Sequence, residues 1–252
     1  MTGVELMPVT EDVEGPVLGE ESRRLAESIM ARYPTRRSAL LPLLYLVQAE
    51  VGWVPRQGMR EVGDIIGLTT AEVEAVATFY TMLKLHPCGR YVISVCTNPS
   101  CALLGARQSY ERARDLLGDD AERVTGDGLL TLEEEECLAA CDKAPVVAVN
   151  YVFFDHVTSD RMEQLIADIR RGTVPEAARG AGVPGDLKEV SRTLAGVGAP
   201  RSDAPADQEP SEDEESPTRT QRDAPTIEEP AAGDKAHGPM GEGEAREEES
   251  DG

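Results

Sequence analysis

Large aromatic side chains are scarce in this 252-residue sequence, and they are missing from its last part. The chain has one Trp, three Phe and six Tyr, and all of them lie at or before Phe154. A stretch with no large ring to bury and many acidic residues does not form an ordinary core by itself. We therefore expect the folded part to stop near Thr173 and residues 174–252 to be an acidic, low-complexity, disordered tail. A short helix at Asp186–Leu194 is the less favoured alternative.

Basic residues are also few. The sequence has 25 Lys and Arg against 47 Asp and Glu, a formal net charge of −22, whereas proteins that bind a nucleic-acid backbone present a basic patch. We therefore expect no nucleic-acid partner. The glycine-rich loops G-x-G-x-x-G and G-x-x-x-x-G-K-S/T are absent as well, so the chain is not expected to bind NAD or ATP by those routes.

No secretory signal or membrane-spanning run is found in the sequence. The N-terminal stretch MTGVELMPVTEDVEGPV has neither a basic nor an apolar region, as a secretory signal would require. The longest apolar run, SALLPLLYLVQAEVGWV, is interrupted by Pro42, Gln48 and Glu50 within less than the roughly 20 residues that a span needs. We expect a cytoplasmic chain without direct membrane insertion, in which this run is a buried helix.

Helical periodicity marks the first region, residues 20–86, as a helical docking domain. Apolar residues recur at helical spacing in four places. The predicted helices occupy residues 20–33, 40–47 and 56–66 and a segment that opens at Thr69. We expect Ser38 to cap the second helix, Gly67 to end the third, and Thr69 with Glu72 to form a capping box.

After Pro87 the pattern changes to that of a mixed α/β (α+β) unit over residues 87–173. Short β-branched or aromatic runs bounded by turn residues predict strands, and two stretches with one apolar face predict helices. The predicted strands are residues 91–95, 129–132, 146–149 and 151–154, and the predicted helices are residues 106–117 and 160–171. A strand and helix followed by hairpin strands and a closing helix is typical of an α/β or α+β domain.

Four of the five cysteines form two close pairs in loops of this second region. Cys96 and Cys101 bracket four residues, and Cys137 and Cys141 bracket three. In a reducing cytosol such clusters are more often metal ligands or redox thiols than disulfides. The candidates are a [2Fe-2S] cluster, a structural zinc and a pair of redox dithiols. Neither pair has the C-x2-C spacing typical of a zinc knuckle or of thioredoxin, so the longer loops favour the cluster.

The residues around the pairs are expected to tune such a site. Ala102, Leu103 and Leu104 could shield one side from water, and the acidic run 133–136 is expected to be a solvated edge that makes the site more negative and lowers its reduction potential. The fifth cysteine, Cys88, is expected to be inert.

Four segments of the chain resemble one family: RYPTRRSALLPLLYLVQAEVGWV, EVEAVATFYTM, VCTNPSC and TGDGLLTLEEEECLAACDKAPVVAVN. They are similar to the thioredoxin-like [2Fe-2S] subunits of respiratory NADH:quinone oxidoreductase, known as the E subunits of bacterial complex I. The resemblance runs from about residue 25 to residue 171. It implies a thioredoxin-like domain in which Cys96 and Cys101 hold one iron and Cys137 and Cys141 hold the other, with no catalytic residue on this chain.

The resemblance also implies partners. The helical region would pack on a subunit that carries FMN and NADH, and the chain would pass single electrons as a peripheral part of complex I at the cytoplasmic face of the inner or plasma membrane. Ala139 and Leu130 stand where the family commonly has Gly and an aromatic residue. Two alternatives stay open: the equivalent subunit of an NAD-linked hydrogenase or formate dehydrogenase, and a zinc-stabilised interaction module.

Overall fold

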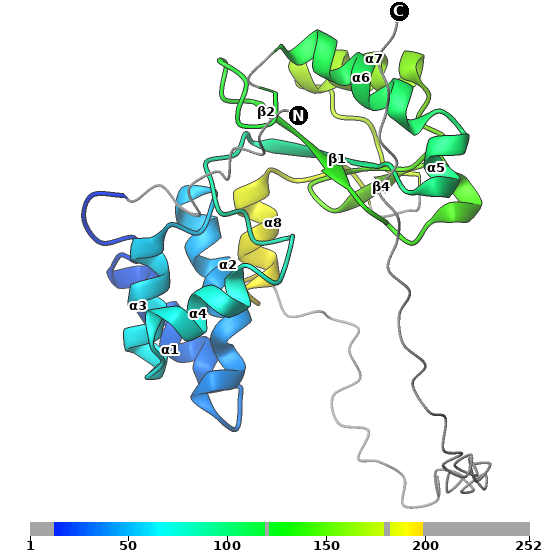
Figure 1. The fold of residues 1–252 in the computed structure, drawn as a ribbon. Helices are drawn as coiled ribbons and strands as arrows, with labels where there is room; N and C mark the ends of the chain where they lie inside the picture. Colours follow the sequence, from blue (N-terminus) through cyan, green and yellow to red (C-terminus); the bar gives the residue numbers. More distant parts are fainter. Residues whose placement is uncertain (1–12, 119–120, 179–181, 199–252) are drawn as a thin grey trace, which may run out of the picture. The chain divides into compact units, whose positions relative to one another are not determined.

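The computed structural model describes residues 13–118, 121–178 and 182–198, and all of these belong to one compact unit of the chain (Figure 1). Two large hydrophobic cores lie within this unit. One is built by the helices of the first part of the sequence, and the other lies between a sheet and two helices of the second part. No helix within the described ranges is both long and apolar enough to cross a membrane.

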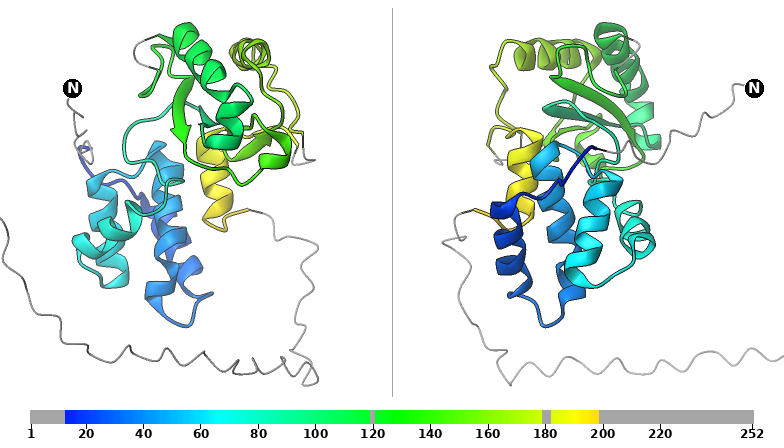
Figure 2. Two further views of the ribbon diagram at one scale, coloured as in Figure 1. Left: turned by 45° about the vertical axis from the view of Figure 1, so that its right-hand side comes forward. Right: turned by 90° about the vertical axis from the view of Figure 1, so that its left-hand side faces the viewer.

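The helical region is built around one apolar helix. Its elements are α1 (Glu20–Met30), the 3-10 helix η1 (Arg36–Ala39), α2 (Leu40–Val51), α3 (Arg56–Ile66) and α4 (Thr70–Ala77). The side chains of Leu43, Leu44, Leu46 and Val47 on α2 are fully buried, because α1, α3 and α4 all pack against this helix. A helix that is apolar nearly all round has to be covered on several sides, as it is here (Figure 2).

Two of the predicted helix boundaries in this region are confirmed and one is wrong. The third helix ends at Gly67, which adopts a left-handed φ of 82°, and Thr69 forms a capping box with Glu72 at the start of α4. Ser38, however, does not cap α2. It lies in η1 with its hydroxyl bonded to that of Thr35, and α2 continues directly from η1 without a side-chain cap.

The second region holds a mixed four-stranded sheet. Its strands are β1 (Tyr91–Cys96), β2 (Leu130–Glu135), β3 (Val147–Val149) and β4 (Val152–Phe154) in the order β2-β1-β3-β4. Strand β1 runs parallel to β2, whereas β3 is antiparallel to both β1 and β4. The other elements are α5 (Pro99–Leu103), α6 (Ala106–Leu117), the 3-10 helix η2 (Cys141–Lys143) and α7 (Ser159–Arg170). The predicted α+β class is confirmed.

The two faces of the sheet have different chemistry. Side chains alternate along a strand, so Ile93 and Val95 of β1 enter the core that α6 and α7 cover. Ser94 and Cys96 belong to the opposite face, where Ser94 contacts Glu133 of β2. One face of the sheet therefore holds a large apolar core, and the other is partly polar.

The end of the described chain corrects the predicted tail. The expectation of disorder over residues 174–252 is wrong in part, because helix α8 (Leu187–Leu194) is well formed and packs on α2. Leu187, Ser191 and Ala195 recur every four residues and are buried, and Asp186 begins the helix with a capping box. The whole segment has few apolar residues, so its composition does not indicate this short stripe of small and apolar residues. Residues 179–181 and 199–252 of the predicted tail lie outside the described part.

Candidate metal centre

The four paired cysteines lie in two loops at the same edge of the sheet. Strands β1 and β2 run in parallel, with Cys96 opposite Glu135 at their carboxyl ends. Cys96 is the last residue of β1, and Cys101 follows on the short helix α5. Cys137 comes two residues after β2, and Cys141 begins η2. Because parallel strands end at the same edge of a sheet, both loops emerge side by side.

The two pairs differ in exposure. Cys96 and Cys101 are each 2% exposed, whereas Cys137 and Cys141 are exposed to solvent, and all four are free thiols. A small hydrophobic cluster surrounds the buried pair and consists of Cys96, Cys101, Ala106, Ala140, Ala144 and Val146, with Leu138 and Phe153 packed against it. One half of the site is therefore anchored in protein, and the other half faces outward.

Backbone groups and neighbouring thiols act on the cysteine sulfurs. The Ala139 N–H donates to Cys137 Sγ at 3.4 Å. Burial raises the pKa of the Cys101 thiol to about 11, the Val146 N–H opposes that shift, and the charges of Cys96 and Cys141 add to it. Cys96, Cys101 and Cys141 are thus close enough to influence one another electrostatically. N–H groups directed at sulfur are a usual means of stabilising thiolates around an iron-sulfur cluster.

The donor chemistry fits a [2Fe-2S] cluster, which takes four cysteine thiolates. Across the described residues, however, no three His, Cys, Asp or Glu side chains are gathered closely enough to hold a metal ion as they stand. The sheet therefore brings both loops to one edge without presenting a closed ligand set. The assignment of Cys96, Cys101, Cys137 and Cys141 as ligands stays a prediction.

The backbone of the second loop accounts for one departure from the family pattern. Ala139 has a φ of 54°, in the left-handed region that non-glycine residues rarely adopt. Glycine reaches this conformation with no steric penalty, which fits the glycine that the resemblance implies for this position. The second cysteine loop therefore has a left-handed residue at this position, with alanine in place of glycine.

The expected shield of the first loop is wrong in part. Leu103 and Leu104 are 86% and 60% exposed, so they do not cover the cysteines. They follow Cys101 at the end of α5, a helix too short to bury both of its faces. Shielding comes instead from the alanines and valine of the small cluster around the buried pair. The two leucines form an exposed apolar pair beside the site.

The acidic run beside Cys137 is not simply a solvated edge. The Lys84 side chain is only 4% exposed and its ammonium lies 2.7 Å from the Glu133 carboxylate, which also accepts a hydrogen bond from Ser94. Glu134 accepts a hydrogen bond from Thr97, next to Cys96. Sequence reasoning missed Lys84. A single lysine in the apolar stretch TMLKLHP was the available signal, since a buried lysine requires an anionic partner.

Cys88 agrees with its expected inert role. It is half-buried, and burial, with the nearby Glu133 carboxylate adding to it, raises the pKa of its thiol to about 12. Such a thiol is almost wholly protonated at neutral pH and is a poor nucleophile.

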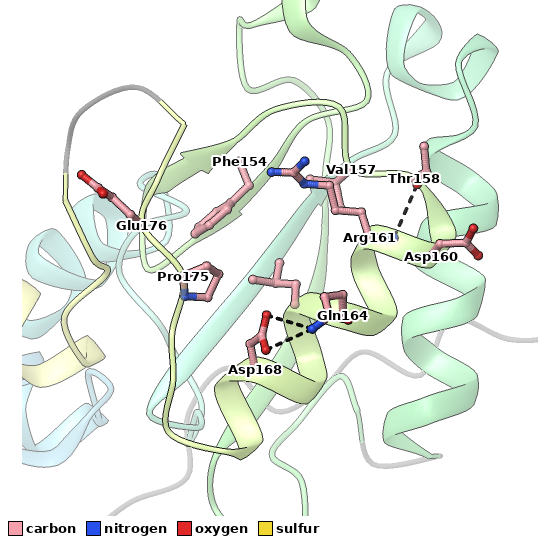
Figure 3. A pocket seen from close by; sticks show the side chains of 10 residues that line it. Phe154, Val157, Thr158, Asp160, Arg161, Gln164, Asp168, Pro175 and Glu176 are labelled. Carbon is pink, nitrogen blue, oxygen red and sulfur yellow. Dashed lines mark hydrogen bonds between the residues drawn. The ribbon is translucent and has the colours of Figure 1, made fainter.

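A separate cavity of about 390 Å³ also lies in this region. It is formed by β4, α7 and the segment at residues 175–176, and Phe154, Val157 and Leu165 supply its apolar wall. Figure 3 shows Arg161, Asp160 and Glu176 around it. None of its lining residues is a cysteine, so it is distinct from the candidate metal centre.

Comparison with known proteins assigns the chain to a family. Residues 26–170 match the family of thioredoxin-like [2Fe-2S] ferredoxins, and the chain belongs to that family. The predicted thioredoxin-like domain and the predicted [2Fe-2S] cofactor are confirmed by this membership.

Relatives of this chain include proteins named as subunits of NADH-quinone oxidoreductase. The E subunit of NADH-quinone oxidoreductase from Mycobacterium tuberculosis is 46% identical over 178 residues, covering 71% of this chain and 70% of the relative. NADH-quinone oxidoreductase subunit 2 of Thermus thermophilus is 37% identical and covers 61% of this chain and 86% of the relative. The crystal structure of NAD+-reducing [NiFe]-hydrogenase in the H2-reduced state aligns at 21% identity with a TM-score of 0.47, covering 54% of this chain and 22% of that one. The expected resemblance to the NADH:quinone oxidoreductase subunits is confirmed by the first two.

Proposed function

We propose that this chain is an electron-transfer subunit of an NADH:quinone oxidoreductase, and that it holds a [2Fe-2S] cluster for exchange of single electrons with FMN on a partner NADH-binding subunit. The observation that carries the proposal is the placement of two cysteine loops at one sheet edge in a chain of the thioredoxin-like [2Fe-2S] ferredoxin family. The relatives named as NADH-quinone oxidoreductase subunits support the choice of complex.

Each pair of cysteines has a distinct part in holding the cluster. Cys96 and Cys101, which lie in the small apolar cluster, would hold one iron, and the exposed Cys137 and Cys141 would hold the other. When bound, a [2Fe-2S] cluster accepts or releases one electron. The N–H groups of Ala139 and Val146 stabilise negative charge on the sulfurs, and the buried side excludes water. These are the means by which the protein sets a cluster's potential.

The partner subunit supplies what this chain lacks. The chain carries no recognisable nucleotide loop, so FMN and NADH belong to the partner, and the helical region offers a surface for it. Phe79 and Tyr80 follow α4 and are 77% and 40% exposed, with their rings in an edge-to-face contact. Exposed aromatic residues are favoured anchors of protein interfaces. As part of the complex, the chain is peripheral to the cytoplasmic face of the inner or plasma membrane.

Metal analysis of the full chain tests the cofactor and its ligands. The protein is expressed anaerobically, iron and acid-labile sulfide are measured, and visible and dithionite-reduced EPR spectra are recorded. We expect two irons and two sulfides per chain, as the cluster composition requires, and loss of both in Cys137→Ser. The matched control Cys88→Ser keeps the cluster. A colourless, redox-silent zinc protein would contradict the proposal and favour the interaction module.

Isolation of the native complex tests the partner. Tagged full-length chain is purified from its own host, and the copurifying proteins, the FMN content and the quinone reductase activity with NADH are determined. We expect an FMN-containing subunit and NADH-dependent quinone reduction. Hydrogenase or formate dehydrogenase subunits in place of the quinone-reducing ones would assign the chain to the equivalent module of those enzymes.

A further inference from the structure

Helix α8 lies beyond the part of the chain that the family describes. The family match ends at residue 170, and the segment 182–198, which contains α8, returns to the helical region at the start of the sequence. Figures 1 and 2 show α8, in yellow, beside α2. The contacts of this segment divide into three groups along its length.

The first group ties the start of the segment to the sheet region. Asn150, in the turn between β3 and β4, is 1% exposed. Its Nδ2 donates to the carbonyls of Arg90 and Gly185, both at 2.8 Å, and its Oδ1 accepts from the Val92 N–H at 2.8 Å. The Leu187 N–H donates to the same Arg90 carbonyl at 2.9 Å. One buried asparagine thus joins strand β1 and the entry to α8.

The second group lays α8 on α2. Leu187, Ser191 and Ala195 form the buried stripe, and the small side chains of the last two permit close approach of the helices. Gln48 of α2 is fully buried, and its Nε2 donates to Ser191 Oγ at 3.0 Å. Lys188 Nζ donates to the Glu50 carbonyl, near the carboxyl end of α2, at 2.8 Å.

Gln48 also links α8 to the connection between the two regions, which contains Met82 and Lys84. Gln48 Oε1 accepts from the Lys84 N–H at 2.7 Å, and its Nε2 also donates to the Met82 carbonyl at 3.2 Å. The Tyr151 hydroxyl, from the β3–β4 turn, donates to that carbonyl at 2.6 Å. Buried amides of this kind are costly to leave unpaired, so the network favours one arrangement of its members.

The third group holds the end of the segment on α1 and the residues after it. Arg32 Nη1 donates to the Gly196 carbonyl at 2.8 Å, and Arg192 forms an exposed ion pair with Glu21 at 3.4 Å. Ala195 joins the helical core itself, with Val197 packed against that core. Both ends of the segment are therefore anchored, one on the sheet region and one on the helices.

We propose that residues 182–198 are a clasp. The clasp fixes the helical region and the sheet region, which holds β1 to β4 and α5 to α7, in one relative arrangement. The two regions have separate hydrophobic cores, and a connection with no regular secondary structure, residues 78–90, joins them. Without further contacts, regions joined in this way move relative to each other. A segment bonded to both removes that freedom. The clasp is independent of the electron partner and goes beyond the proposed function.

Hydrogen exchange on the cluster-loaded full chain tests the clasp. Two truncations are compared: one removes residues 182–252, and the matched control removes only residues 199–252. We expect the control to exchange like the full chain. The longer truncation should show at least about tenfold faster exchange in peptides of α2 and of residues 78–90, while the visible spectrum of the cluster is unchanged. A synthetic peptide of residues 182–198, added in trans, should restore the protection.

A pair of point variants keeps the test decisive if the truncated chain folds poorly. Leu187→Asp places a charge in the buried stripe, and Thr193→Asp places the same charge on the exposed side of α8. We expect faster exchange in α2 only for Leu187→Asp. Unchanged exchange in the truncation and in Leu187→Asp would overturn the proposal. So would loss of the cluster together with the protection, because the segment would then belong to a core common to both regions.

Discussion

Ala139 is a single residue on which the geometry of the second cysteine loop depends. Its φ of 54° carries a penalty of about 1 kcal/mol for an alanine, which glycine avoids. We expect Ala139→Gly to raise the free energy of unfolding by up to about 1 kcal/mol, the gain being limited by the greater freedom of the unfolded chain. The temperature at which the cluster absorbance is lost measures this change in stability. Ala140→Gly is the control: Ala140 has a negative φ, so its change should destabilise, and an equal gain there would contradict the explanation.

Two carboxylates beside the site bear on its reduction potential. Glu134 accepts from Thr97, the residue after Cys96, and Glu135 lies opposite Cys96. Negative charge near a cluster disfavours the addition of an electron. We expect Glu134→Gln with Glu135→Gln to raise the potential in an EPR-monitored redox titration. The exposed Glu27 of α1 supplies a control as Glu27→Gln, and equal potentials for all three proteins would rule the effect out.

Cys88 gives a prediction that depends on pH. Its thiol pKa is raised to about 12, chiefly by burial, so the reactive thiolate is nearly absent at pH 8 and becomes the main form only as the pH approaches 12. We expect slow alkylation of Cys88 by iodoacetamide at pH 8 in the cluster-loaded chain, with a rate that still rises about tenfold per pH unit above pH 9. Mass spectrometry of the peptide that contains Cys88 measures the rate. A plateau near pH 9 would show an ordinary exposed thiol.

The ion pair between Lys84 and Glu133 joins a loop to a strand. Lys84 belongs to the connection after α4 and Glu133 to β2, and Ser94 of β1 bonds the same carboxylate. Removal of one partner leaves a charge with little access to water, at a cost of about 3 kcal/mol or more. We expect Lys84→Met to lower the free energy of unfolding by about that amount in chemical denaturation.

The double variant separates loss of pairing from loss of packing. Lys84→Met combined with Glu133→Leu removes both charges, and replacement of a buried pair by apolar side chains is often close to neutral. We expect the double variant to recover most of the stability. If it is as unstable as Lys84→Met alone, the stabilisation comes from the shape of the lysine side chain and not from the pairing.

The assembled molecule presents an apolar pair next to its cysteine loops. Leu103 and Leu104 are largely exposed, and only Ala102 separates them from Cys101 in the sequence. Apolar side chains in such a position are typical of a surface that another protein covers. We expect Leu103→Ser with Leu104→Ser to weaken copurification of the proposed flavin-bearing partner at least about tenfold, with the iron content unchanged. The exposed Leu194 provides the control Leu194→Ser, and an equal loss there would assign the effect to general surface change.

The local features of this protein follow from the amino-acid sequence because each depends on neighbouring residues. Helix α3 with Gly67, helix α6 and the Thr69 capping box are set by apolar spacing, by backbone preference and by a bond over three residues. The close spacing of the two cysteines within each loop is also visible in the sequence. Four thiols in two loops of an α+β unit, with the family that this pattern indicates, could therefore be predicted without coordinates.

Contacts between distant residues were decided only by the tertiary structure. Helix α8 has too few apolar residues to be stable alone, and it forms because α2 and Asn150 supply the surface and the hydrogen bonds that it needs. Lys84 is buried because β2 places Glu133 against it. Leu103 and Leu104 are exposed at the end of α5, a helix of only five residues. Burial depends on what another part of the chain brings to a residue, which no short stretch of sequence encodes.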